Sequence, residues 1–163
     1  MPHAITALIL PGTHDTAAAD RWDLVPVPLH GGLTLFHLTH YYTAFWQATR
    51  KVADYVELPS EASGLFPREG VLRILAADLS ARPDPTFAVV FTDYFAGAGE
   101  QWATVSVAGG PLLSVSTINA ALRTLGVTAA AGLDEFDTVG LSAHRSSPDY
   151  LHRYLDLCDE LGV

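Results

Sequence analysis

The apolar residues near the N-terminus follow the short periods of β-strands. Residues 4–10 (AITALIL) form an apolar run that Pro11 and Gly12 end, which predicts a buried strand. Residues 24–29 (LVPVPL) contain two prolines. Because proline has no N–H to donate to a ladder, this extended segment belongs at the edge of a sheet. Residues 33–38 (LTLFHL) predict the next strand, in a hairpin with that edge segment.

Four later segments carry the spacing of amphipathic helices, and the chain between them is predicted to be irregular. The predicted helices are residues 40–56 with Thr39 as N-cap, residues 67–81 starting at Pro67, residues 118–126 with Ser116 or Thr117 as N-cap, and residues 146–163 with Ser147 as N-cap. Residues 13–23 are typical of a loop that can hold one helical turn, and residues 133–145 are predicted to be irregular.

The stretch DYFAGAGEQWATVSV contains two glycines, Gly97 and Gly99, at the spacing found in phosphate-binding loops. A dinucleotide fingerprint requires a third glycine and a helix after the loop, because the helix N-terminus meets the pyrophosphate. Here the third position is Trp102, and the residues that follow it alternate as in a strand. We therefore predict a hairpin between residues 85–95 and 101–109, with a glycine-rich turn and no nucleotide site.

The predicted order of elements is strands, two helices, a hairpin and two helices. A regular β-α-β alternation is absent, which argues against a parallel sheet. We therefore predict a single α+β domain over residues 1–163. It should have a mixed or antiparallel sheet of about five strands, with about four helices packed mainly on one face.

The charge of the chain restricts its partners. The formal net charge is −9, and Lys51 is the only lysine. Nucleic acids and anionic membranes are recognised by clustered Lys and Arg, so neither is expected as a partner. A basic protein is favoured instead. The apolar share of 49% can fill a core or supply the interface of a homodimer. The preference for Arg over Lys, with abundant Ala, is typical of a high-GC bacterial coding sequence.

Cysteine usage and the N-terminus indicate a cytoplasmic protein. Cys158 is the single cysteine, so an internal disulfide and a cysteine zinc cluster are excluded. The N-terminal apolar run is short and has no basic residues before it, so it predicts a strand and not a signal peptide. No apolar segment approaches the roughly 20 residues that span a bilayer.

The histidines provide the only candidates for catalysis or metal binding, and each candidate is incomplete. His37 and His40 have a metal-like spacing, but a strand-to-helix boundary between them and the lack of a third ligand argue against a metal. His14, beside Asp15, and His144 could act in acid–base catalysis. No G-x-S-x-G nucleophile motif is present. We therefore assign no catalytic residue, no metal and no cofactor.

Two short stretches combine carboxylates with an aromatic residue, as surfaces that grip basic proteins do. The first flanks the hairpin turn and the second lies in the segment LDEFD. The candidate partner-binding residues are Asp93, Tyr94, Glu100 and Gln101 in the first stretch, and Asp134, Glu135, Phe136 and Asp137 in the second. The alternative is that the first stretch consists of solvated polar residues at strand ends and the second is a solvated turn. Arg145, just after the second stretch, is a candidate anion contact.

These observations favour a non-enzymatic protein that binds another protein. Small size, acidity and the lack of catalytic motifs are shared with small bacterial partner-binding proteins, including toxin-neutralising immunity proteins, although no diagnostic motif carries that likeness. The most specific hypothesis is an immunity-type protein that neutralises a basic partner. The alternative is a small enzyme with a pocket around His14 or His144. A homodimer is compatible with either hypothesis.

Overall fold

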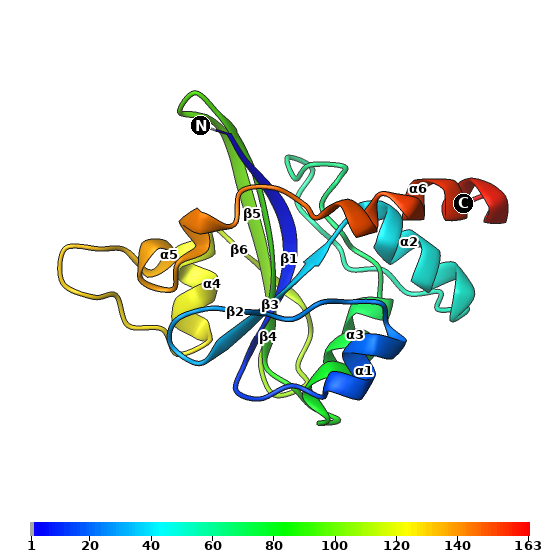
Figure 1. The fold of residues 1–163 in the computed structure, drawn as a ribbon, viewed down its shortest axis with the longest axis horizontal. Helices are drawn as coiled ribbons and strands as arrows, with labels where there is room; N and C mark the ends of the chain where they lie inside the picture. Colours follow the sequence, from blue (N-terminus) through cyan, green and yellow to red (C-terminus); the bar gives the residue numbers. More distant parts are fainter. Residues whose placement is uncertain (1) are drawn as a thin grey trace.

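The computed structural model describes residues 2–163, and a six-stranded antiparallel sheet is its central element (Figure 1). The strands lie in the order β2-β3-β1-β4-β5-β6, and each neighbouring pair is antiparallel. Their bounds are β1 His3–Pro11, β2 Val27–Pro28, β3 Leu33–Leu38, β4 Phe87–Phe95, β5 Ala98–Ser106 and β6 Leu113–Val115. The predicted strands and both predicted hairpins are present. The additional strand is β6, which has only 3 residues.

Helices cover both faces of the sheet, as the edge-on view in Figure 1 shows. One face carries α1 (Thr16–Arg21), α2 (His40–Thr49), α3 (Val71–Ser80) and α6 (Arg153–Leu161). The other face carries α4 (Ile118–Thr124) and α5 (Glu135–Thr138). The α+β class is therefore confirmed, with most helices on one face. Two helices that the sequence did not define, α1 and α5, are short.

Strand β1 supplies apolar side chains to both faces, which explains its uninterrupted apolar sequence. Leu8 and Leu10 belong to the cluster beneath α1, α2 and α3. Ile5 and Ile9 belong to the cluster beneath α4. All four side chains are at most 2% exposed. The core is thus two apolar layers separated by one sheet.

Helix α2 is shorter than the predicted helix over residues 40–56 because the chain reverses just after it. Lys51 adopts a left-handed backbone conformation with φ 55°. The buried side chain of Gln47 then donates to the Asp54 carbonyl oxygen at 2.8 Å and accepts from the Val71 backbone N–H at 2.9 Å. This amide side chain joins the turn after α2 to the first turn of α3, which has no side-chain cap of its own.

Two predicted N-caps have different outcomes. Thr117 caps α4, and its hydroxyl accepts from the Ala120 backbone N–H at 3.0 Å. The last helix was predicted over residues 146–163, but a 3-10 turn over Asp149–Leu151 comes first and α6 starts only at Arg153. Ser147 therefore caps no helix.

The segment over residues 144–148 crosses from the α5 side of the sheet to the α6 side (Figure 1, orange). It lies beside β1 beyond the end of β3, where the Ala4 backbone N–H donates to the Arg145 carbonyl oxygen at 2.8 Å. A parallel bridge joins Ala4 to Ser146. We call this segment the crossing segment.

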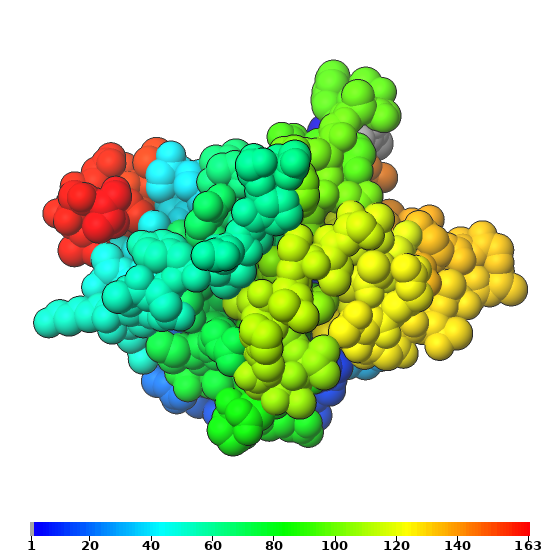
Figure 2. All heavy atoms as spheres, turned by 180° about the vertical axis from the view of Figure 1, so that it is seen from behind, coloured from blue at the N-terminus to red at the C-terminus, as the bar shows by residue number. Residues whose placement is uncertain are grey.

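Strands β4 and β5 extend beyond the helices as a hairpin, whose tip stands above the neighbouring surface in Figure 2. Phe95 pairs with Ala98, so the turn is Ala96 and Gly97, which have φ values of 53° and 80°. Positive φ at both turn residues matches the twist of a tight hairpin. The predicted hairpin is confirmed. None of the helices in the described part of the chain combines the length and apolar character that a membrane span requires.

Candidate functional site

The predicted residues of the hairpin lie on two opposite faces of it. Side chains alternate along a strand, and Asp93 and Glu100 are directly opposite each other in the register of β4 and β5. They share the face of Phe91, which belongs to the cluster beneath α1, α2 and α3. Tyr94 and Gln101 point to the α4 and α5 side. The hairpin rim predicted as one surface is therefore two surfaces.

We call the surface formed by Asp93, Glu100 and Phe95 the acidic face. Phe95, beside the hairpin turn, is 71% exposed. The Glu100 carboxylate accepts a hydrogen bond from the indole N–H of Trp102 at 3.2 Å, which keeps the carboxylate close to the strand. Among residues 2–163, neither carboxylate forms a salt bridge. Two like charges thus stand opposite each other with no cation between them, an arrangement that destabilises a sheet.

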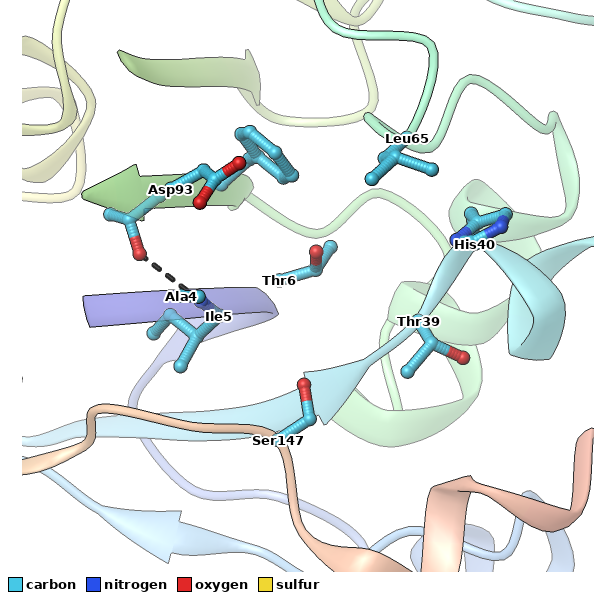
Figure 3. Close-up of a pocket in the computed structure, with 10 residues that line it drawn as sticks. Ala4, Ile5, Thr6, Thr39, His40, Leu65, Asp93 and Ser147 are labelled. Atoms are coloured by element: carbon cyan, nitrogen blue, oxygen red, sulfur yellow. Dashed lines mark hydrogen bonds between the residues drawn. The ribbon is translucent and has the colours of Figure 1, made fainter. Parts of the chain in front are cut away.

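A cavity of about 220 Å³ lies on the same side of the sheet as the acidic face, and we call it the α2-side cavity (Figure 3). Asp93 and His40 line it from different elements, with Ser147 of the crossing segment at another wall. Burial lowers the pKa of His40 below its usual value. The imidazole is therefore neutral near pH 7, and the only formal charge that these three side chains bring to the cavity is negative.

A second cavity, of about 340 Å³, lies between the hairpin and α5, and we call it the α5-side cavity. Tyr94 and Gln101 line it from the hairpin, and Asp134 and Phe136 line it from the α5 segment. The structure thus brings together residues from the two stretches that the sequence singled out. Arg145 of the crossing segment also lines this cavity.

His3 forms part of the wall of the α5-side cavity, and sequence reasoning missed it. Its Nε2 lies 3.0 Å from the Leu141 carbonyl oxygen, and because a carbonyl only accepts, Nε2 is the donor. Its Nδ1 lies 2.7 Å from the Thr92 hydroxyl oxygen, and that oxygen accepts from the Ile5 backbone N–H at 3.1 Å. An imidazole that donates from Nε2 and accepts at Nδ1 from the Thr92 hydroxyl satisfies all these groups. Only the tertiary contacts reveal this role, because nothing in the local sequence marks His3.

The three carboxylates of the second acidic stretch have different surroundings. The Asp134 carboxylate caps α5 by accepting from the Asp137 backbone N–H at 2.8 Å. Glu135 pairs with Arg123 at 3.0 Å, and this hydrogen bond lowers the pKa of the Glu135 carboxyl. Asp137 is exposed at the surface. The predicted role of these carboxylates in binding a partner stays a prediction.

The histidines considered for catalysis lie in different environments. The Asp15 carboxylate beside His14 caps α1 by accepting from Ala17 and Ala18 backbone N–H groups. His144 lies 6.4 Å from His37 between ring centroids. Burial, followed by the neighbouring His144, lowers the pKa of His37 to about 4. Of the histidines in residues 2–163, only His152 has a carboxylate within salt-bridge distance, that of Asp149.

Comparisons with known proteins give no family assignment. Within the described residues, no group of three or more His, Cys, Asp or Glu side chains could hold a metal ion. No protein-family model matches the chain, and neither a curated protein nor a solved structure is significantly similar to it.

Proposed function

We propose that this protein binds a basic partner protein through the acidic face of the hairpin. The observation that carries the proposal is the pair of opposed carboxylates, Asp93 and Glu100, on a projecting hairpin beside the exposed Phe95. Like charges directly opposite each other weaken a ladder. A lysine or arginine of a partner that approaches both carboxylates would relieve this repulsion.

The surroundings of the acidic face suit such a side chain. The α2-side cavity, of about 220 Å³, opens beside Asp93 and can accept the apolar stem of a long basic side chain. Phe95 offers an aromatic anchor of the kind that contributes strongly to protein interfaces. The net charge of −9 would attract a basic partner over a distance and so speed association.

The most specific form of the proposal is an immunity-type role, in which the acidic face covers the basic active site of a toxin. Such a site must hold several cations in a small area, and two carboxylates beside an aromatic anchor complement that arrangement. A second copy of the chain is a poor occupant of the acidic face. Like faces in a symmetric dimer would bring four carboxylates together, counting Asp93 and Glu100 from each copy.

The test compares three immobilised forms of the protein as baits for a lysate of the source organism. The first is the wild type, and the second carries Asp93→Lys and Glu100→Lys. The third carries Asp159→Lys and Glu160→Lys, a matched change of net charge at exposed positions near the end of α6. Proteins that the wild type and the α6 variant retain, and the hairpin variant loses, are identified by mass spectrometry.

We expect a basic protein in that difference set, eluting as salt is raised. With the purified partner, Phe95→Ala and the hairpin variant should each weaken binding by at least about tenfold. The salt dependence of the affinity should also be smaller in the hairpin variant, because fewer charges take part. The proposal is wrong if the hairpin variant retains the same proteins as the wild type.

A further inference from the structure

The α5-side cavity is lined by several hydrogen-bond donors that have no acceptor in the described protein, and its position between the hairpin and α5 separates it from the acidic face. Its volume of about 340 Å³ lies at the lower end of the range for small-molecule sites, roughly 300–1,000 Å³. Tyr94, Ile118 and Phe136 give it apolar walls. A ligand that fits this cavity would therefore be small and partly apolar. The donors and acceptors that line the cavity determine which polar group the ligand should carry.

The side-chain acceptors around the cavity are largely occupied within the protein. Both oxygens of Asp134 accept hydrogen bonds, one from the Asp137 backbone N–H at 2.8 Å and one from the Asn119 side-chain amide at 3.1 Å. The Asn119 amide oxygen accepts from the Phe136 backbone N–H at 2.8 Å. The Gln101 amide oxygen accepts from the Ile118 backbone N–H, also at 2.8 Å.

Several donors around the cavity keep hydrogens that no protein group accepts. Within residues 2–163, the Arg145 guanidinium forms no ion pair, and neither it nor the Ser142 hydroxyl donates a side-chain hydrogen bond. The Tyr94 hydroxyl accepts from the Gln101 side-chain amide at 3.1 Å and keeps its own hydrogen for a further acceptor. The groups without a protein acceptor are thus one cation and two hydroxyl donors, while Asp134, whose two oxygens accept hydrogen bonds, has no cation paired with it among residues 2–163.

We propose that the α5-side cavity binds a carboxylate that is joined to a small aromatic or aliphatic body. The carboxylate would accept from the Arg145 guanidinium, which offers two parallel donors, and from the Tyr94 hydroxyl. The apolar body would pack against Phe136 and the Tyr94 ring. Either a free small-molecule acid or the C-terminal carboxylate of a peptide can supply this chemistry. The site does not depend on the acidic face, whose side chains point to the other side of the sheet.

The test uses three probes that share one apolar body and differ only in the polar group. 3-Phenylpropanoate, 3-phenylpropanamide and 3-phenylpropylamine are titrated into the ¹⁵N-labelled full chain, and the NMR shifts of the Arg145, Gln101 and Asn119 side-chain N–H groups are followed. We expect the carboxylate to bind most tightly and the amine least. Tighter binding of the amine would show that the Asp134 charge dominates the cavity. That result would overturn the proposal. The proposal would also be overturned if neither 3-phenylpropanoate nor the dipeptide acid used below bound to the protein.

Variants then assign the binding to the named donors. Arg145→Gln removes the charge from an exposed side chain and should weaken carboxylate binding at least about fivefold, with little effect on the amide. Tyr94→Phe keeps the ring and should give a smaller loss. Arg82→Gln, which removes an exposed guanidinium elsewhere on the surface, is the matched control and should bind like the wild type. Unchanged carboxylate affinity in Arg145→Gln would overturn the proposal.

A second pair of probes distinguishes the two sources of the carboxylate. N-acetyl-Ala-Phe with a free C-terminus is compared with the same dipeptide as its C-terminal amide. If the dipeptide acid binds more tightly than 3-phenylpropanoate, and Arg145→Gln removes the advantage over the amide, the natural ligand is the C-terminus of a peptide. If 3-phenylpropanoate binds more tightly, the ligand is a small-molecule acid.

Discussion

Removing either carboxylate of the opposed pair should stabilise the protein, although both lie on the surface proposed to bind a partner. Side chains directly opposite each other on an antiparallel pair have Cβ atoms about 4.5–5.5 Å apart. The perturbations are Asp93→Asn and Glu100→Gln, alone and combined. Each substitution keeps the size of the side chain, and glutamine keeps an oxygen that can accept from Trp102.

The magnitude follows from Coulomb's law. Two exposed carboxylates about 6 Å apart in water repel each other by about 0.7 kcal/mol. A Debye length of about 10 Å reduces this to about 0.4 kcal/mol at about 0.1 M salt, and one of about 3 Å reduces it to about 0.1 kcal/mol at about 1 M. Each single variant should therefore gain about 0.7 kcal/mol of stability at low salt. The double variant should gain little more, because the repulsion is already gone.

The assay is urea unfolding followed by tryptophan fluorescence, at low and high salt, arranged as a double-mutant cycle. Asp20→Asn is the matched control, since it removes an exposed carboxylate from α1 and reports the general effect of lowering the net charge. The reasoning is refuted if Asp93→Asn and Glu100→Gln have simply additive effects at low salt. It is also refuted if their coupling energy does not fall as salt rises.

Three further predictions concern His37, Gln47 and Gly99. The pKa of His37 is lowered to about 4 in the folded protein. Between about pH 6.5 and pH 4, His37 is therefore protonated in the unfolded chain but not in the folded protein. As pH drops from 7 to 4, the free energy of unfolding should fall by about 3 kcal/mol more in the wild type than in His37→Phe, as measured by urea unfolding. If the free energy of unfolding had the same pH dependence in both proteins, this prediction would be contradicted. Gln47→Leu leaves a buried backbone N–H without an acceptor and should cost about 2 kcal/mol in the same assay; a loss below about 0.5 kcal/mol would contradict the bridging role. Gly99→Ala places a methyl group on the Asp93 carbonyl oxygen and should cost about 2 kcal/mol, with NMR shift changes centred on the hairpin; a variant as stable as the wild type would disprove that close approach.

Local sequence patterns predicted correctly those strands and turns that are determined by residues close to them in the sequence. The apolar run of β1, the two prolines of the edge segment that contains β2, and the glycine turn between β4 and β5 are such local causes, and all three predictions are confirmed. The ends of α2 and α6 were predicted less well because long-range contacts set them. The Gln47 side chain bonds to the first turn of α3, and the crossing segment pairs with Ala4 in place of starting a helix at Ser147.

In the candidate site, too, the sequence identified individual residues but not the contacts that depend on the tertiary structure. The sequence identified Tyr94, Gln101, Asp134 and Phe136, but it could not show that they share one cavity, because that depends on how α5 packs against the hairpin. It also grouped Asp93 with Tyr94, although adjacent residues of a strand point to opposite sides. The grouping overlooked that alternation, which the predicted strand over residues 85–95 already implied.

Alternation along the strand gives the hairpin two faces with opposite chemistry. On the acidic face the carboxylates of Asp93 and Glu100 form no salt bridge among residues 2–163, and they favour binding of a cation. On the α5 side the donors without a protein acceptor are Tyr94, Ser142 and Arg145, which favour an anion. Because the sheet separates the two faces, neutral isosteric substitutions on one face leave the other intact. Asp93→Asn should therefore weaken the proposed partner complex without changing the affinity for 3-phenylpropanoate, and Tyr94→Phe should do the reverse. If both substitutions impaired both activities, the two faces would form a single site, and the separation argued from strand geometry would be wrong.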